Sequence, residues 1–160
     1  MQQAQGAIDA ARAAAAPEYA KEEFDAAVKA LERAHQAATD RDYRQALNDA
    51  LDARDRAQTS VRMAADNMAT ARVEADRAVA AATASYDVVR KRLADLDAAK
   101  TPPRNLAGPR KAIEETGLQL QEARTAFDQK HYAVATSTAN AVSKAIISAS
   151  TAIDELAAPP

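Results

Sequence analysis

The central stretch of this chain, residues 43–100, contains neither glycine nor proline. Apolar or small side chains recur there every three or four residues, which is the spacing of one face of an α-helix. These positions are Ala46, Ala50, Ala53, Ala57, Val61, Ala64, Met68, Ala71, Ala75, Ala78, Ala82, Ser85, Val89, Leu93 and Leu96. We predict one helix over about 43–100, roughly 85 Å long if it is straight. Its alanine seam has the a/d spacing of a coiled coil and predicts close packing against other helices. A kink near residues 80–85 remains open.

The chain also contains an internal repeat. Residues 34–46 return as residues 123–135 without a gap, so that Tyr43 aligns with Tyr132, 89 residues later. In both copies an apolar helical stripe ends in a polar break, a Tyr follows, and a second stripe begins. This order predicts an αα-hairpin that occurs twice, as a pseudo-repeat over about 4–60 and another over about 95–157.

Composition agrees with an all-helical chain. Alanine, the strongest helix former, supplies 45 of the 160 residues, whereas glycine supplies only three. Aromatic residues make up 4% of the chain, and a buried alanine removes little apolar area from water, so the core must be thin. We expect an all-α fold: a single elongated helical domain over residues 1–160, made of two pseudo-repeated αα-hairpins joined by the long helix.

Prolines and acidic residues predict the boundaries before the long helix. Residues 4–16 are expected to form a short helix that Pro17 ends. A second helix is expected from Glu18, because acidic side chains favour the first turn. Its predicted inner face consists of Phe24, Ala27, Val28, Leu31, Ala34 and Ala38. Asp40 or Asp42 is expected to cap the start of the long helix.

Prolines also predict the boundaries after it. Thr101-Pro102-Pro103 should stop the long helix. The next helix is expected to start at Asn105 or Gly108, with Pro109 in its first turn. Two packings fit these elements: one four-helix bundle with the long helix projecting beyond it, or two hairpins at opposite ends of a rod.

Charge and hydropathy exclude several classes of function. The formal charge is −2 and charges of both signs alternate, so no basic stripe predicts nucleic-acid binding. No apolar run approaches the ~18 residues of a transmembrane helix. Met1-Gln2-Gln3 lacks the basic and apolar regions of a signal peptide. The absence of cysteine excludes disulfides and thiol chemistry.

The sequence predicts no catalytic, cofactor-binding or metal-binding residues, and no cofactor. His35 and His131 stand near helix ends without a neighbouring nucleophile or a Gly-rich elbow. Glu32 and His35 form a Glu-x-x-His, but the further inward carboxylates that di-iron bundles use are missing, so we interpret them as a solvated flank. Three scattered glycines cannot build a phosphate loop. We therefore expect a protein that is not an enzyme, with unknown binding residues.

A run of alternating charges on the long helix permits two interpretations. Asp49, Asp52 and Asp55 interleave with Arg54 and Arg56. The run can serve as a polar recognition strip, or it can be an ordinary solvated face in which an i,i+4 pair contributes a few tenths of a kcal/mol. We favour the solvated face.

The two aligned tyrosines also permit two interpretations. Tyr43 and Tyr132 can be platforms for a ligand, or each can pack at the corner between two helices. We favour corner packing, because each tyrosine opens a helix at the same position of the repeat.

Three segments carry a resemblance to a known family. They are Ala16–Phe24, Leu31–Ala34 and Asp40–Ala46. They resemble an uncharacterised Ala-rich, tetratricopeptide-like hairpin domain of bacterial cell-envelope lipoproteins, sometimes found with OmpA-like domains. The tetratricopeptide-like positions are Ala34, Tyr43, Ala46, Ala50 and Ala53, and again Ala123, Tyr132, Ala135 and Ala139. The resemblance implies a periplasmic or cell-envelope location, with a lipid anchor or cell-wall domain only in a longer precursor.

We expect a non-enzymatic protein–protein interaction or scaffold module, with the cell envelope implied by resemblance alone and the cytoplasm as the alternative. The expected partner is another protein, or a second copy that packs on the Ala-rich helix faces. Two other functions stay open: a coiled-coil spacer or oligomerisation rod, and a four-helix sensor domain for a small molecule.

Overall fold

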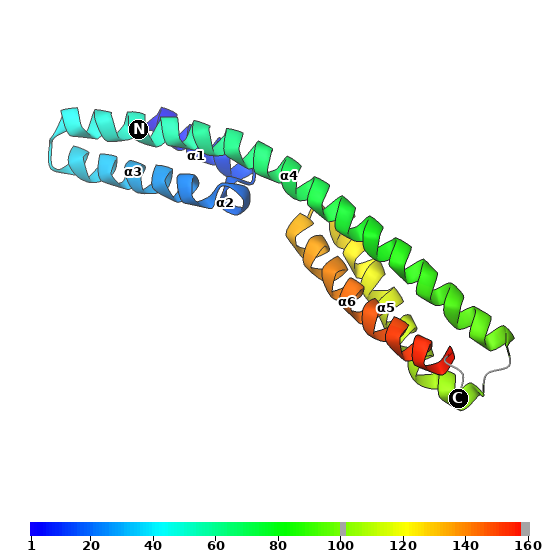
Figure 1. Cartoon of the computed structure of the whole chain (residues 1–160). Helices are drawn as coiled ribbons and strands as arrows, with labels where there is room; N and C mark the ends of the chain where they lie inside the picture. The colour runs from blue at the N-terminus through cyan, green and yellow to red at the C-terminus, as the bar shows by residue number, and fades with distance from the viewer. Residues whose placement is uncertain (100–101, 158–160) are drawn as a thin grey trace. The chain divides into compact units, whose positions relative to one another are not determined.

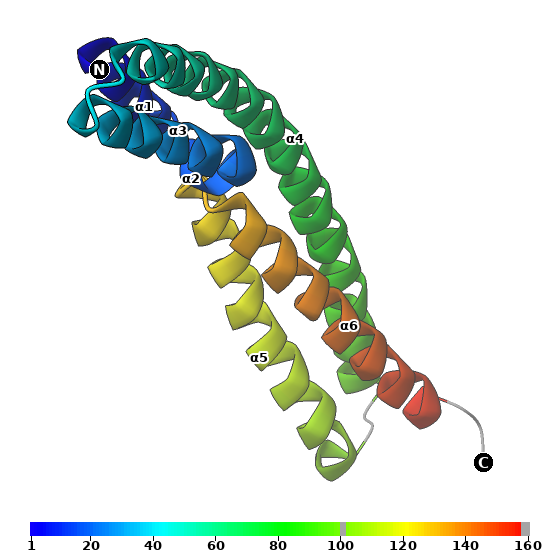
Figure 2. The same ribbon diagram turned by 90° about the vertical axis from the view of Figure 1, so that its left-hand side faces the viewer.

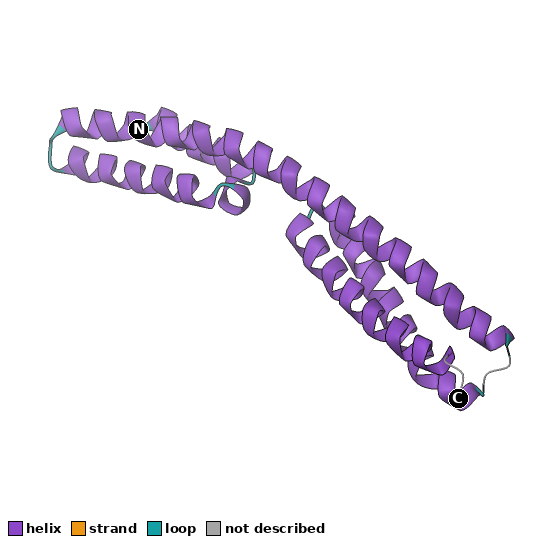
Figure 3. Ribbon diagram, viewed as in Figure 1, coloured by secondary structure: helices purple, strands orange, loops and turns teal. Residues whose placement is uncertain are grey.

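The computed structural model describes residues 1–99 and 102–157, and nearly all of them are helical (Figure 3). The described residues form six helices and no strand: α1 (Gln2–Ala13), α2 (Ala16–Tyr19), α3 (Lys21–Thr39), α4 (Tyr43–Ala98), α5 (Pro103–Asp128) and α6 (Tyr132–Ala157). The predicted all-α class is confirmed. The predicted long helix is confirmed as α4, which runs without interruption through residues 80–85. Residue 100, the last of the predicted helix, lies outside the described residues.

The chain divides into two compact units, Met1–Thr70 and Ala71–Pro160. We call the first bundle 1; it contains α1, α2, α3 and residues 43–70 of α4. We call the second bundle 2; it contains residues 71–98 of α4, α5 and α6 (Figures 1 and 2). One predicted pseudo-repeat falls in each unit, and the division between the units lies inside a helix.

Bundle 1 has a core made largely of alanine. The α3 side chains on its inner face include Phe24, Ala27 and Leu31, and they cluster with Ile8 of α1 and Ala57 of α4. Because alanine side chains are small, the axes of the helices can approach closely. The predicted inner face of α3 is confirmed at Phe24, Ala27, Leu31 and Ala34, whereas Val28 and Ala38 are only partly buried.

Bundle 2 has larger core side chains in its last helix. Val142, Ile146 and Ile153 of α6 are buried among residues of α4 and α5. These three stand 89 residues after Ala53, Ala57 and Ala64, which are fully buried in bundle 1. The two copies of the hairpin therefore keep the same inward positions and fill them with side chains of different volume.

The alanine seam of α4 is covered by helices of the same chain. Ala53, Ala57 and Ala64 are fully buried within bundle 1, and Ala82 is fully buried within bundle 2. The seam is interrupted in the middle of α4, since residues 65–74 include no buried side chain. A second chain is not needed to cover the seam where it is buried.

The two hairpin turns have the same backbone conformation. Two residues after the last residue of α3 and of α5, the backbone is left-handed: Arg41 has φ 62° and Lys130 has φ 64°. The next N–H in each turn reaches back to the preceding helix: Asp42 donates to the carbonyl of Ala37 at 2.9 Å, and His131 donates to that of Ala126 at 2.8 Å. Both turns are therefore Schellman motifs, which confirms the repeat at the level of backbone hydrogen bonds.

The start of α4 has the side-chain cap that the sequence predicts. The Asp42 carboxylate accepts a hydrogen bond from the backbone N–H of Gln45 at 2.9 Å. This contact satisfies one of the free donors at the first turn of the helix. Of the two predicted candidates, Asp42 is the cap.

The prediction that Pro17 ends the first helix is wrong. The helix α1 ends at Ala13, and Pro17 instead lies in the first turn of the short helix α2. Proline is favourable there because its missing N–H would have no helical partner. The break comes from Ala15, whose φ is 59°. The next long helix begins at Lys21 rather than at Glu18, which belongs to α2.

The predicted start of the helix after α4 is also wrong. The helix α5 begins at Pro103, before Asn105 and Gly108, so Pro109 lies inside it. Because proline has no N–H, the carbonyl of Asn105 loses its helical partner. Leu106 lies in this first part of α5 and is fully buried in the core of bundle 2, and its burial favours the longer helix. Thr101, part of the predicted stop, lies outside the described residues.

Candidate interaction surfaces

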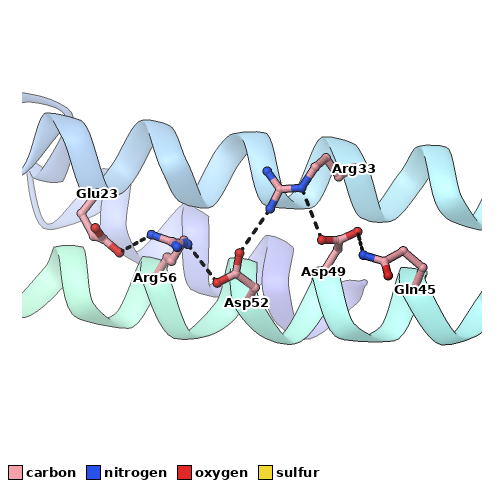
Figure 4. Close-up of polar contacts among 6 residues, drawn as sticks. All are labelled: Glu23, Arg33, Gln45, Asp49, Asp52 and Arg56. Carbon is pink, nitrogen blue, oxygen red and sulfur yellow. Dashed lines mark hydrogen bonds and ion pairs between the residues drawn. The ribbon is translucent and has the colours of Figure 1, made fainter.

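A row of ion pairs joins α3 to α4 within bundle 1 (Figure 4). The guanidinium of Arg33 on α3 donates to Asp49 at 3.3 Å and to Asp52 at 3.2 Å. Asp52 also accepts from Arg56 at 2.9 Å, and Arg56 donates in turn to Glu23 on α3 at 3.1 Å. The row therefore crosses between the two helices three times and fixes their register.

The most buried member of this row is Asp49, which is only 8% exposed. Its carboxylate is satisfied by Arg33 and by the side-chain amide of Gln45, which donates at 2.9 Å. The hydrogen bond and charge of Asp52, together with the charge of Glu23, raise the pKa of Arg56 above its ordinary value. These contacts make the row a structural link between helices.

Neither interpretation of the charge run describes all of it. Asp49, Asp52 and Arg56 hold α3 against α4, so they form neither a free recognition strip nor a purely solvated face. Arg54 and Asp55 stand apart and pair with each other at 2.8 Å. Sequence reasoning missed Glu23 and Arg33, the partners on α3. The sequence does show these two opposite charges on the helix before the acidic run. They can be paired with the acidic run only when the register of the two helices is known.

The aligned tyrosines have different environments. Tyr132 is 6% exposed, and its ring meets that of Phe127 edge-on with 5.5 Å between the centroids. Tyr43 is 71% exposed. The residue that aligns with Phe127 is Ala38, which has no ring to offer. Corner packing is therefore confirmed for Tyr132 and wrong for Tyr43.

Bundle 1 has a groove between α1 and α4, which we call the α1/α4 groove. Its α4 side presents side chains at alternating steps of four and three residues: Leu47, Leu51, Arg54, Gln58 and Val61. Its α1 side presents Gln3, Ala7 and Ala10, again at steps of four and three. Leu47 is 60% exposed and Leu51 is 40% exposed. Two leucines on neighbouring turns are thus left in contact with water.

Bundle 2 has a related groove between α4 and α6, which we call the α4/α6 groove. It is lined by Ala84, Ser85, Val88, Val89, Ile146, Ile147 and Ser150. Val88 is 58% exposed and Ile147 is 67% exposed. Ile147 aligns with Gln58 of the α1/α4 groove, so the same side of the repeated hairpin is uncovered in both bundles.

A third groove lies between α5 and α6. It is lined mainly by small side chains, with Glu115, Thr116 and Gln119 as polar members. The hydroxyl of Thr116 donates to the carbonyl of Ala112 in its own helix, at 2.6 Å. A small-molecule site needs polar groups from several walls, but three of the four polar side chains of this groove lie on α5 and only Ser148 lies on α6.

The histidines do not form a metal site in the part of the chain that the structure describes. Within residues 1–99 and 102–157, no group of His, Asp and Glu side chains is placed to hold a metal ion. Glu32 and His35 are both exposed on α3, as the solvated-flank interpretation predicts. His131 belongs to the second hairpin turn.

Among the described helices, none combines the length and hydropathy needed to cross a lipid bilayer. Comparisons of the chain with protein-family models, with curated proteins and with solved structures found no match.

Proposed function

We propose that this chain is a non-enzymatic interaction or scaffold module that binds helices of other proteins. One observation carries the proposal: each bundle exposes large apolar side chains beside a groove between two of its helices. In bundle 1 these are Leu47 and Leu51, and in bundle 2 they are Val88 and Ile147. Amphipathic helices bind such grooves by placing apolar side chains at i, i+3, i+4 and i+7 against the walls.

Burial of these side chains would supply the driving force. Covering an exposed Leu or Ile side chain removes apolar area from water at about 25 cal/mol per Å². The remainder of the surface is rich in charges of both signs, which lowers the tendency to associate elsewhere.

The two alternative functions have less support. An oligomerisation rod zipped by the alanine seam would need free seam positions, yet Ala53, Ala57 and Ala82 are fully buried within one chain. A small-molecule sensor would need polar groups that converge from several helices. The α5/α6 groove, its best candidate, draws its polar groups mostly from α5.

We further propose a bacterial cell-envelope setting. Its support is the resemblance in the segments Ala16–Phe24, Leu31–Ala34 and Asp40–Ala46. An antibody against the native protein, applied to fractionated cells, tests it. Recovery with periplasmic or membrane markers supports the setting, and recovery with cytoplasmic markers contradicts it.

Site-specific photo-crosslinking tests the proposed function. A photoreactive benzoylphenylalanine is placed at Leu47 or Ile147, and at Lys29 or Lys91 as exposed polar controls on the same bundles. In the cells that make the protein, positions 47 and 147 should give discrete protein adducts in higher yield than positions 29 and 91. Equal yields at all four positions, or none, would overturn the proposal.

A further inference from the structure

The two walls of the α1/α4 groove have matching helical spacing. Leu47, Leu51 and Arg54 begin the stripe on α4, with steps of four and then three residues, and the stripe on α1 has the same two steps. One part of the groove is lined by Leu47 and Leu51, and the other by Gln58 and Val61. Gln3 and Arg54 line both parts, so the groove is continuous. Two neighbouring helices with this spacing form the holes that receive knobs from a further helix. This spacing of the lining residues favours an α-helix as the occupant of the groove.

The α1 wall is uncharged and formed by small residues. Ala7 and Ala10 line it, and a Cβ added to Gly6 would meet no atom within 4 Å, so the space beside this wall is open. The two charges of α1 are directed to each other: Arg12 pairs with Asp9 at 3.3 Å. An occupant can therefore approach the backbone of α1 closely without burying a charge on that side.

The α4 wall is bordered mainly by cations. Arg54 lines the groove itself. Arg44 precedes Leu47 by three residues and Arg62 follows Gln58 by four, so both exposed arginines border the same stripe. Asp55 also borders the stripe and pairs with Arg54, whereas Asp49 and Asp52 are held by Arg33 on α3. The border of the stripe thus has three arginines, Arg44, Arg54 and Arg62, against Asp55, and this excess of positive charge favours an occupant that carries carboxylates.

The same charges disfavour a second copy of the chain as the occupant. Arg54 lies at the centre of the stripe that runs from Leu47 to Val61. An antiparallel two-fold pairing of this stripe with itself would place the two Arg54 side chains against each other. Like charges in direct contact across an interface oppose association.

We infer that the α1/α4 groove binds an amphipathic helix of another protein, one whose apolar face has heptad spacing and is flanked by Asp or Glu. The apolar face covers Leu47 and Leu51, and the flanking carboxylates meet Arg44, Arg54 and Arg62. The inference rests on the proposed function and gives it a partner chemistry and a location.

Two synthetic peptides test the inference with the purified full chain. Both are about three heptads long and carry leucine at the a and d positions; one has Glu and the other Lys at the flanking e and g positions. Fluorescence anisotropy at low salt should show that the Glu peptide binds at least about tenfold more tightly than the Lys peptide. The preference should shrink at 1 M salt, where charges are screened.

Three variants locate the binding. Leu51→Asp should weaken the Glu peptide by about tenfold or more, and Arg54→Glu should reverse the preference between the peptides. Ile147→Asp, a matched change on an exposed residue of the other groove, should leave both affinities unchanged. Thermal melts establish that each variant is folded; Arg54→Glu keeps the test valid if Leu51→Asp does not fold.

Several results would contradict the inference. Equal affinity for the two peptides, or loss of binding on Ile147→Asp but not on Arg54→Glu, would overturn the inference. So would crosslinks from position 47 that join two copies of the chain. Crosslinks to another protein from position 147 with none from position 47 would overturn the inference and leave the proposed function intact; crosslinks from neither position would remove both.

Discussion

Arg41 and Lys130 occupy the same left-handed position in two turns that lie 89 residues apart, with φ of 62° and 64°. Glycine is the usual residue at this position, because a Cβ is unfavourable in the left-handed region. The chain thus carries the same local strain twice.

Replacing the first of these residues with glycine should stabilise the protein. Arg41→Gly relieves the left-handed strain, and part of that gain is offset by the greater freedom of glycine in the unfolded chain. We expect a net gain of about 0.5 kcal/mol, measured by urea unfolding. Arg77→Gly, the same change at an exposed position in the interior of α4, should instead cost about 1 kcal/mol. A loss of stability from Arg41→Gly would contradict the prediction.

The helical glycines should respond unequally to alanine. Gly6→Ala has open space around the new Cβ and should add about 1 kcal/mol to the free energy of unfolding. A Cβ at Gly117 would lie 2.6 Å from the Tyr86 hydroxyl oxygen, so Gly117→Ala should lose this gain or destabilise the protein. Thermal unfolding of both variants measures the difference. In a Tyr86→Phe background the penalty of Gly117→Ala should fall; an unchanged penalty would show that the hydroxyl is not its cause.

The buried Asp49 of the α3–α4 row should contribute more to the free energy of unfolding than the exposed Asp55 nearby. Asp49→Asn removes the charge that Arg33 and Gln45 hold, and should cost about 1 kcal/mol. Asp55→Asn, on a largely exposed carboxylate paired with Arg54, should change stability by less than about 0.5 kcal/mol. Urea unfolding at low and high salt checks both, and salt should reduce the cost of Asp49→Asn. Equal costs for the two variants would refute the distinction.

The aligned tyrosines give a matched pair of truncations. Tyr132→Ala removes a ring that is buried against Phe127 and should destabilise the protein by about 3 kcal/mol. Tyr43→Ala removes an exposed ring and should change stability by less than about 0.5 kcal/mol. Chemical unfolding followed by circular dichroism provides the measurement. A comparable loss from Tyr43→Ala would mean that its ring is packed in solution.

The long helix and both hairpin turns were predictable because their signals are local. Spacing alone identifies the inward side of α4, and the repeat locates the two breaks. Pro109 misled the prediction because burial of Leu106 outweighs the hydrogen bond that the proline removes. Weighing the lost backbone hydrogen bond against the burial of a side chain requires knowledge of how the helices pack.

The candidate surfaces were less predictable because they depend on which helices meet. The exposure of Tyr43 follows from the small size of Ala38, a residue that contributes nothing to the local signal of Tyr43. The role of Asp49 depends on Arg33, which lies on a different helix. The α4 residues that line the α1/α4 groove have helical spacing in the sequence. The neighbouring alanine seam has the same kind of spacing and is more regular, so the sequence alone does not single out the groove residues.

The division between Thr70 and Ala71 falls within continuous α4 rather than in a loop. If the chain were cut at that point, each unit would gain an uncapped helix end, where backbone N–H or C=O groups lack their helical hydrogen-bond partners. A protease would therefore cleave this junction only after several turns had frayed, and genetic separation of the two halves calls for newly designed capping residues on both sides of the cut.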